Sequence, residues 1–402
     1  MNKCLQLILS FAVLLPLLTG CWDRQELNEL GIMLGLGVDK DGDMIKVSAQ
    51  VVVPNEVSSK SKSGGGKGTP VTQYQASAPT LFEAIQKLTE SSPRRIFMAH
   101  IRVLVFGEEY ARKNGIYDVT EALMREPTVR PDYYVMVARN TTASKVLDVL
   151  TPLENIPAEK MFNSLDVSSK IWSPTTTVTG DQLMEYILSP GIQPVITGIE
   201  VIGQPAKSGN QSNIATIRSP ARLNSTGLSV FKGDKLIGWL TEDESKGYNY
   251  IRNNVVSTIS HLPCRKEGYV TFKALRTTTK RHAKVVAGHP VVNIKMKNVS
   301  SIGAVECEIK IGSMKVLKEL ERDSEERLVD LMQKSVKSVQ RKFHVDIFGF
   351  GQEVYHADPK FFKKVEKDWD SYLENLDVHY DVNVQIKRVG TLDDSFKDQI
   401  RE

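Results

Sequence analysis

The residue with the clearest chemistry in this sequence is Cys21, which follows Leu18-Thr19-Gly20 at the end of an apolar run. The pattern is typical of a lipobox, in which the cysteine thiol receives a diacylglyceryl group. Cleavage between Gly20 and Cys21 then makes this cysteine the new N-terminus, whose amine is acylated in turn. Because two or more acyl chains hold a protein stably on a bilayer, we predict that residues 1–20 are a lipoprotein signal peptide and that Cys21 is lipidated.

The segment before Cys21 has the other parts of a secretory signal. Lys3 supplies the positive start, and residues 5–18 form an apolar core. This core is too short for a membrane-spanning helix, which needs about 20 residues. The alternative is an ordinary secretory signal in which Cys21 has no special role. We expect the lipoprotein, anchored through its acyl chains on the outer face of the cell membrane.

The remaining reactive residues do not form a catalytic or metal-binding pattern. His261 and Cys264 stand three apart, but no second pair of ligands follows them. Residues 227–231 do not fit a nucleophile elbow because the fifth residue is Phe. Residues 35–37 do not begin a dinucleotide-binding motif because position 40 is Lys. We therefore expect no enzyme activity, no metal site and no cofactor.

Composition is that of an ordinary folded protein, with 402 residues, 41% hydrophobic residues and a net charge of +4. This charge is too small for a nucleic-acid-binding protein, which carries clustered basic residues. After Cys4 is removed with the signal and Cys21 is lipidated, Cys264 and Cys307 remain. Outside the cytoplasm they can form a disulfide, but two buried free thiols fit the sequence equally well.

An N-terminal α/β layer domain is predicted over residues 21–155. Two apolar stretches, 30–38 and 44–53, flank an Asp-Gly pair and indicate a β-hairpin. Helices and strands then alternate, as expected for a layered α/β domain. The helices are expected from residue 80 to Pro93, at 108–114 and at 116–125, and the strands at 96–106 and 133–138.

The rest of the chain completes an α+β multidomain fold. Residues 156–222 are rich in Pro, Ser, Thr and Gly, which indicates a small middle domain and a linker, with a helix at 182–188 and a strand at 194–202. Residues 223–402 are predicted to form a C-terminal α+β domain with a mostly antiparallel sheet. Its elements are a hairpin at 227–240, strands at 269–272, 283–286, 291–296 and 303–311, a long helix with capping-box spacing at Asp323 and Glu326, a helix at 361–376 and a strand at 378–386.

Several short motifs, taken in order along nearly the whole chain, resemble the C-subunit family of bacterial spore germinant receptors, the GerAC-like lipoproteins. The motifs are Cys21-Trp22-Asp23, Glu26-Leu27-Asn28, residues 35–39, Pro93-Arg94-Arg95 with His100, Gly107-Glu108 with Ala111 and Gly115, Val230-Phe231-Lys232, Leu236-Ile237-Gly238, residues 346–351, Trp369 and residues 384–390. A Lys/Gly/Ser-rich segment at residues 58–69 departs from the family pattern and resembles an insertion.

This resemblance implies a non-catalytic, lipid-anchored subunit of a nutrient germinant receptor in the spore inner membrane, needed for assembly or signal coupling. Its implied partners are the A and B membrane subunits, and the B subunit rather than this chain is expected to bind the germinant. The alternative is a solute-binding lipoprotein of a transporter. Such a protein has a parallel sheet in each of two lobes, and the antiparallel character after residue 227 argues against it.

Five residues in the family motifs are candidates for a partner interface. Arg94, Arg95 and His100 form one group, although a structural role is favoured for His100 because a histidine between apolar residues on a strand is usually buried and hydrogen-bonded. Phe348 and Phe350 form the other group. The glycines beside Phe350 permit a tight turn after the long helix, so both rings are expected to fill the core, with partner docking as the second possibility.

Overall fold

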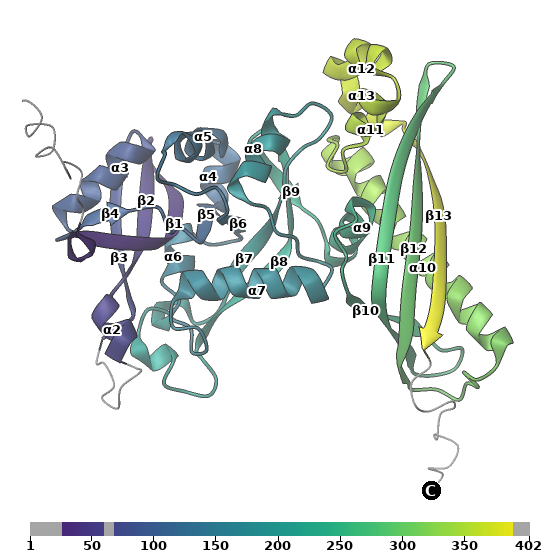
Figure 1. The fold of residues 1–402 in the computed structure, drawn as a ribbon, viewed down its shortest axis with the longest axis horizontal. Coiled ribbons are helices and arrows are strands. Elements are labelled where there is room, and N and C mark those ends of the chain that lie inside the picture. Colours follow the sequence, from purple (N-terminus) through teal and green to yellow (C-terminus); the bar gives the residue numbers. More distant parts are fainter. Residues whose placement is uncertain (1–25, 60–67, 389–402) are drawn as a thin grey trace, which may run out of the picture.

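The computed structural model describes residues 26–59 and 68–388, which form two β-sheets with helices packed around them (Figure 1). The predicted signal peptide, Cys21 and most of the predicted insertion lie outside the described residues. The N-terminal sheet has helices on both faces, and the C-terminal sheet is packed against one long helix (Figure 1). The predicted α+β fold class is confirmed.

The N-terminal sheet is mixed. Parallel pairing joins the strands at its centre, and antiparallel pairing joins those at both ends. The predicted hairpin is confirmed, with a turn in which Gly42 has a φ of 59°, a conformation that glycine adopts readily. In spatial order the strands are β3 (Val71–Ala78), β2 (Met44–Val52), β1 (Leu30–Asp41), β5 (Val103–Gly107), β6 (Tyr134–Ala138), β7 (Val195–Gly203), β8 (Ala221–Lys232) and β9 (Lys235–Trp239), with β4 (Arg95–Phe97) also beside β1.

The single strand expected at 96–106 is wrong, because this segment forms two strands, β4 and β5. Both pair in parallel with β1, β4 with residues 30–32 and β5 with residues 35–38. Between them the chain leaves the sheet in a turn that contains the exposed His100. The polar His100 therefore lies at the break between the two strands. The apolar composition of residues 96–106 did not indicate this break.

Helices cover both faces of the N-terminal sheet and close a separate apolar core on each. The expected helix after Thr80 is confirmed, and the Thr80 side chain caps it by accepting the N–H of Glu83. The helices on one face are α3 (Leu81–Lys87), α4 (Glu108–Lys113), α5 (Tyr117–Arg125) and α8 (Gly180–Leu188), those on the other are α6 (Ala143–Leu147) and α7 (Pro157–Ile171), and α2 (Pro54–Ser59) follows β2.

Residues 156–222 contribute to the N-terminal sheet. Strand β7 pairs with β6 through Val137 and Gly198, and β8 continues the same sheet. The sequence indicated α8 and β7 but missed α7, which begins with Pro157 at a position where the missing N–H has no helical partner. The division of the chain at residues 155 and 222 stays a prediction.

The C-terminal sheet is mostly antiparallel, as predicted, with strands β10 (Thr258–Pro263), β11 (Tyr269–Val286), β12 (His289–Val305) and β13 (Asp377–Arg388). The four short strands expected between 269 and 311 are two long ones, because β11 and β12 form one continuous hairpin of 18 and 17 residues. Strand β13 then pairs in parallel with β12.

Helix α10 (Met314–Ser338) packs along this sheet (Figure 1). The predicted start at Asp323 is wrong, because the helix begins after Ser313 and the buried Leu320 extends its apolar face toward the N-terminus. The helix expected at 361–376 is broken by a short 3₁₀ turn. The other helices are α9 (Glu242–Arg252), α11 (Phe350–Ala357), α12 (Pro359–Val365) and α13 (Trp369–Glu374), and no helix in the described ranges is long and apolar enough to cross a membrane.

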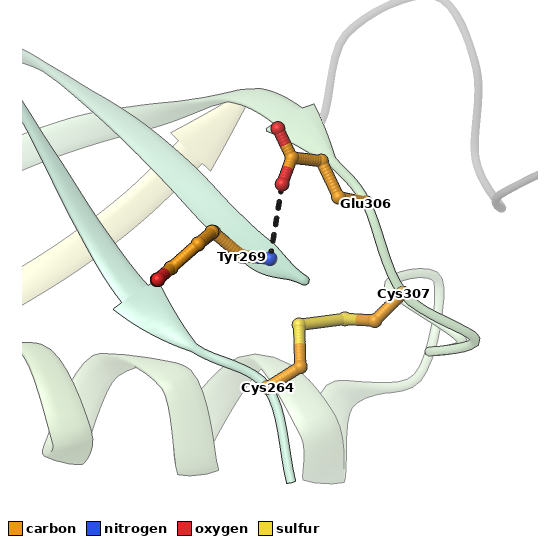
Figure 2. Close-up of a disulfide and its surroundings, with 4 residues drawn as sticks. All are labelled: Cys264, Tyr269, Glu306 and Cys307. Carbon is orange, nitrogen blue, oxygen red and sulfur yellow. Dashed lines mark hydrogen bonds between the residues drawn. A yellow bond between two sulfur atoms is a disulfide. The ribbon is translucent and has the colours of Figure 1, made fainter. Parts of the chain in front are cut away.

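Cys264 and Cys307 form a disulfide, which decides between the two states that the sequence left open. The bond joins the end of β10 to the segment after β12, with a Cα–Cα distance of 6.4 Å. Figure 2 shows Glu306 next to it, where the carboxylate accepts the backbone N–H of Tyr269 at 3.2 Å. The disulfide therefore fastens the end of the hairpin beside a small core that contains Phe272.

Candidate functional site

The predicted site residues fall into three places, of which the anchor lies outside the described residues. Gly20 and Cys21 therefore keep their predicted roles as cleavage and lipidation positions. The first described strand, β1, begins at Leu30. Because an extended chain spans at most about 3.6 Å per residue, the start of β1 lies within about 32 Å of the predicted anchor.

Arg94, Arg95 and His100 lie at this end of β1. Arg95 is exposed and pairs through its backbone with Leu30. His100 is also exposed, with its ring 5.9 Å from that of Phe97, so the expectation of a buried histidine on a strand is wrong. The physical reason is that the turn between β4 and β5 carries His100 away from the sheet. Arg94, Arg95 and His100 therefore remain candidates for a partner-binding surface near the predicted anchor.

Phe348 and Phe350 lie in the C-terminal core and have no exposed surface. Their ring centroids are 4.9 Å apart, and Tyr248 lies 6.0 Å from Phe348. A fully buried ring offers no surface to a partner protein. The structure therefore supports the expected packing role for both residues and gives no support to direct partner docking.

The same segment contains Asp346, a carboxylate that is only 1% exposed. Its Oδ1 atom accepts the backbone N–H groups of Phe348 and Gly349, both at 2.9 Å. Its Oδ2 atom accepts the N–H of Gly351 at 2.7 Å and the indole N–H of Trp369 at 2.9 Å. Burial raises the pKa of Asp346, and hydrogen bonds from donors that include Gly351, Trp369 and Phe348 oppose that rise. Because each oxygen already accepts two hydrogen bonds, this carboxylate holds a turn and cannot act as a base.

This turn also contacts the N-terminal half of the chain. The N–H of Gln193 donates to the Asp346 carbonyl at 2.6 Å. The backbones of Gly191 and Gly351 approach so closely that a Cβ atom on Gly351 would lie 2.6 Å from the Gly191 Cα. Gln193 lies just before β7, so this contact links the C-terminal core to the N-terminal sheet.

Arg252 at the end of α9 adds a further link. It donates to the carbonyl of Phe348 at 3.0 Å and to the hydroxyl of Tyr186 on α8 at 3.4 Å. We call residues 346–351, with Gly191, Gln193, Arg252 and Trp369, the Asp346 joint. The joint connects α8 and β7 of the N-terminal half with α9, α11 and α13.

A groove with a volume of about 710 Å³ lies where α7, β8, the start of α9 and the end of the α10 segment meet. Arg139, Lys160 and Lys342 line it, together with Trp172 and Trp239. We call this the cationic groove. Its volume is in the range of about 300–1,000 Å³ that is usual for ligand sites.

Two of these cations are held in place by neutral groups. The Arg139 guanidinium lies 4.8 Å from the ring centre of Trp239 and donates to the Thr226 hydroxyl at 3.3 Å. Lys160 donates to the backbone carbonyl of Leu223 at 3.1 Å, and burial lowers the pKa of its ammonium group. The groove therefore presents positive charge that the protein itself has partly desolvated.

Both halves of this two-sheet chain match spore germination domains. The domain described as "Spore germination protein N-terminal domain" matches residues 23–201, and the domain described as "Spore germination B3/ GerAC like, C-terminal" matches residues 226–390. The chain therefore belongs to the GerAC-like family of spore germination proteins, the C-subunit family that its sequence motifs indicated.

Known relatives match over nearly their full length. Spore germination protein KC of Bacillus subtilis (strain 168) is 28% identical over 406 residues, which cover 100% of this chain and 99% of that protein. Spore germination protein B3 of the same organism is 23% identical, covering 93% of this chain and 95% of that protein. The crystal structure of the GerBC protein shares the fold, with a TM-score of 0.56, 19% identity and coverage of 90% of this chain and 99% of that one.

Sequence reasoning found the Asp346 turn but missed its partners and the cationic groove. Gly191, Gln193 and Arg252 are far from Asp346 in the chain, and no local pattern joins them. The glycines on both sides of Phe350 were a usable signal, because close approach of two backbones requires them. The groove had no signal in the sequence, since Lys160 lies on the helix that was not predicted.

Proposed function

We propose that this chain is the lipid-anchored, non-catalytic C subunit of a nutrient germinant receptor, held on the outer face of the spore inner membrane. In this role it assembles with the A and B membrane subunits and couples their response to the germinant. The observation that carries the proposal is family membership over both halves of the chain, directly after the lipobox. The names of the relatives, spore germination proteins KC and B3, support a role in germination.

The Asp346 joint supports a coupling role. A subunit can shift a receptor between two states only if it binds one state more tightly than the other. The joint connects the N-terminal half, which follows the predicted anchor, to the C-terminal sheet through a satisfied buried polar network. Such networks hold two bodies in one fixed arrangement. A partner bound to the N-terminal half would therefore set the position of the C-terminal half.

The test is co-purification of a C-terminally tagged chain from detergent-solubilised spore inner membranes. The variant Cys21→Ala removes the predicted lipid, and Cys4→Ala is the matched control because it changes a cysteine ahead of the cleavage position. We expect the wild type and Cys4→Ala to bring down two multi-spanning membrane proteins. We expect Cys21→Ala to lose the membrane fraction, and mass spectrometry of the N-terminal peptide to find acyl chains only where Cys21 is present.

Two outcomes would contradict the proposal. The first is a chain that purifies alone or with the ATPase of a transporter, because this would favour a solute-binding lipoprotein. The second is a normal nutrient response in spores that lack the chain. Titration of the purified protein with amino acids and sugars adds a check, since a micromolar site for such a nutrient in this chain would replace coupling by direct binding.

A further inference from the structure

The strand edge of β8 is open where it faces the cationic groove. Pairing between β8 and β9 covers residues 229–232 of β8 and ends with a hydrogen bond from Leu240 to the Leu228 carbonyl. Between residues 222 and 227, no strand in the described part of the chain pairs with β8 on this side. Open edges of this kind can accept a further strand.

Two side chains form hydrogen bonds with backbone groups of this edge, as a neighbouring strand would. The Asn213 side chain bonds both the N–H and the carbonyl of Ala221. The Lys160 ammonium group donates a hydrogen bond to the carbonyl of Leu223. Because backbone groups on one side of a strand recur every second residue, these two contacts mark the side of β8 on which an added strand would bond.

The charges around this edge are not neutralised by the chain. Within residues 26–59 and 68–388, no carboxylate forms an ion pair with Arg139, Lys160 or Lys342. Glu242 also lines the groove, but it is exposed and pairs with Lys246 at 2.6 Å. The positive lining is therefore complementary to an acidic ligand.

The groove also has an apolar wall. Trp172 lies at the end of α7 and lines the groove. It is 42% exposed, which is unusual for tryptophan, the residue type with the largest apolar side chain. Aromatic residues of this kind are enriched where proteins bind other proteins. An open strand edge, unpaired cations and an exposed indole together define the chemistry of an extended peptide with acidic side chains.

We propose that the cationic groove binds an extended, acidic segment of a partner protein, which adds as a strand to residues 222–227 of β8. Its backbone would replace Lys160 at the Leu223 carbonyl, and its carboxylates would pair with Lys160 and Lys342. Recognition by strand addition is a common mode of peptide binding. Because Lys160 lies on α7 and Lys342 follows α10, one bound segment would bridge the two halves of the chain. This goes beyond the receptor assignment, which does not specify a peptide site.

The test measures peptide binding to the full chain in detergent by fluorescence anisotropy. The probe is an acetylated and amidated peptide of alternating Glu and Val. The double variant Lys160→Gln/Lys342→Gln is compared with Lys315→Gln/Lys337→Gln, which removes the same charge from exposed positions on α10 outside the groove lining. We expect the groove variant to bind the probe about tenfold or more weakly, and the control variant to bind like the wild type.

A second probe tests the strand geometry. The same peptide with an N-methyl group on every residue keeps its charge but has no N–H group on either edge to donate to a strand, and we expect it not to bind. Equal binding of the methylated peptide, or an equal loss in both double variants, would overturn the proposal. So would binding of anionic phospholipid vesicles through Lys160 and Lys342 without binding of the peptide. No receptor subunit is present in the assay, so these failures would leave the proposed function untouched.

Discussion

The Asp346 joint and the cationic groove both lie where the two halves of the chain meet, but their charged groups differ in whether they have partners. In the joint, one buried carboxylate has four hydrogen-bond donors, two on each oxygen. In the groove, three cations face an open space and no carboxylate of the described chain pairs with them. A satisfied buried charge fixes structure, whereas an unpaired one beside open space is available for recognition.

The largest effect is expected for Asp346→Asn, which changes one atom of the joint. An amide has one acceptor oxygen, so its NH₂ group must face two of the four donors. Buried donors without a partner cost about 1–3 kcal/mol each, and we expect the free energy of unfolding to fall by about 3–5 kcal/mol. Urea unfolding followed by tryptophan fluorescence measures this.

The matched control for this change is Asp358→Asn. Asp358 accepts the N–H of Phe361 at 2.9 Å as the N-cap of α12, and Asn caps a helix as well as Asp. The control is expected to change stability by about 0.5 kcal/mol or less. Equal effects of the two variants would mean that the joint holds no more of the fold than an ordinary helix cap.

The next largest loss of stability is expected when the disulfide is removed. The disulfide lies outside both the Asp346 joint and the cationic groove. The double variant Cys264→Ser/Cys307→Ser releases a link between residues 43 apart. Loops of this length are usually worth about 2–4 kcal/mol, and denaturant unfolding with and without a reductant measures the loss. Peptide binding in the groove should be unchanged. Stability that does not respond to the variant or to the reductant would contradict this prediction.

A smaller effect is expected for Gly351→Ala, which probes the close contact within the joint. The added methyl group would lie 2.6 Å from the Gly191 Cα, so the two backbones must move apart. Overpacking of this kind costs about 1–3 kcal/mol. Gly209→Ala is the control, because its Cβ would meet only the Asp148 carbonyl, at an ordinary 3.6 Å. A shift in the melting temperature of Gly351→Ala no larger than that of the control would contradict the assigned contact.

The smallest effect on stability is expected at the exposed surface near the start of β1. Arg95→Glu and His100→Ala remove groups that lie in solvent, and surface changes usually stay within about 0.5 kcal/mol. If these residues contact a receptor partner, co-purification should fall while the thermal melt stays unchanged. Arg265→Glu is the charge-matched control, since the Arg265 side chain is 91% exposed beside the disulfide. A lower melting temperature for His100→Ala would instead support the structural role that was first expected for His100.

The sequence was sufficient wherever a local pattern carried the information. The first hairpin followed from apolar stretches around Asp41-Gly42, and the helix after Thr80 followed from its cap and its periodicity. The long helix was also expected, but the capping-box spacing at Asp323 placed its start too late. Asp323 lies within α10 and the helix begins nearer to Met314, because charged residues also occur inside exposed helix faces.

Sequence reasoning failed where distant residues meet. His100 was expected to be buried because apolar residues surround it, but the chain turns there and exposes it. Lys160 could not be assigned to a groove, because the helix that carries it was hidden by a Pro- and Ser-rich composition. The distant partners of the Asp346 turn are Trp369 on α13, Gln193 before β7, and Arg252 on α9, which bonds the Phe348 carbonyl. Only the folded chain brings them within hydrogen-bond distance.

The parallel pairing of β12 with β13 has a consequence for the order of folding. A chain synthesised from its N-terminus produces β13 after every other described strand. Until then, one side of β12 has no neighbouring strand, and long unpaired strands tend to associate with other chains. Folding of the C-terminal half is therefore completed only after residues 377–388 have been added. The interval before that is when this protein is most exposed to aggregation.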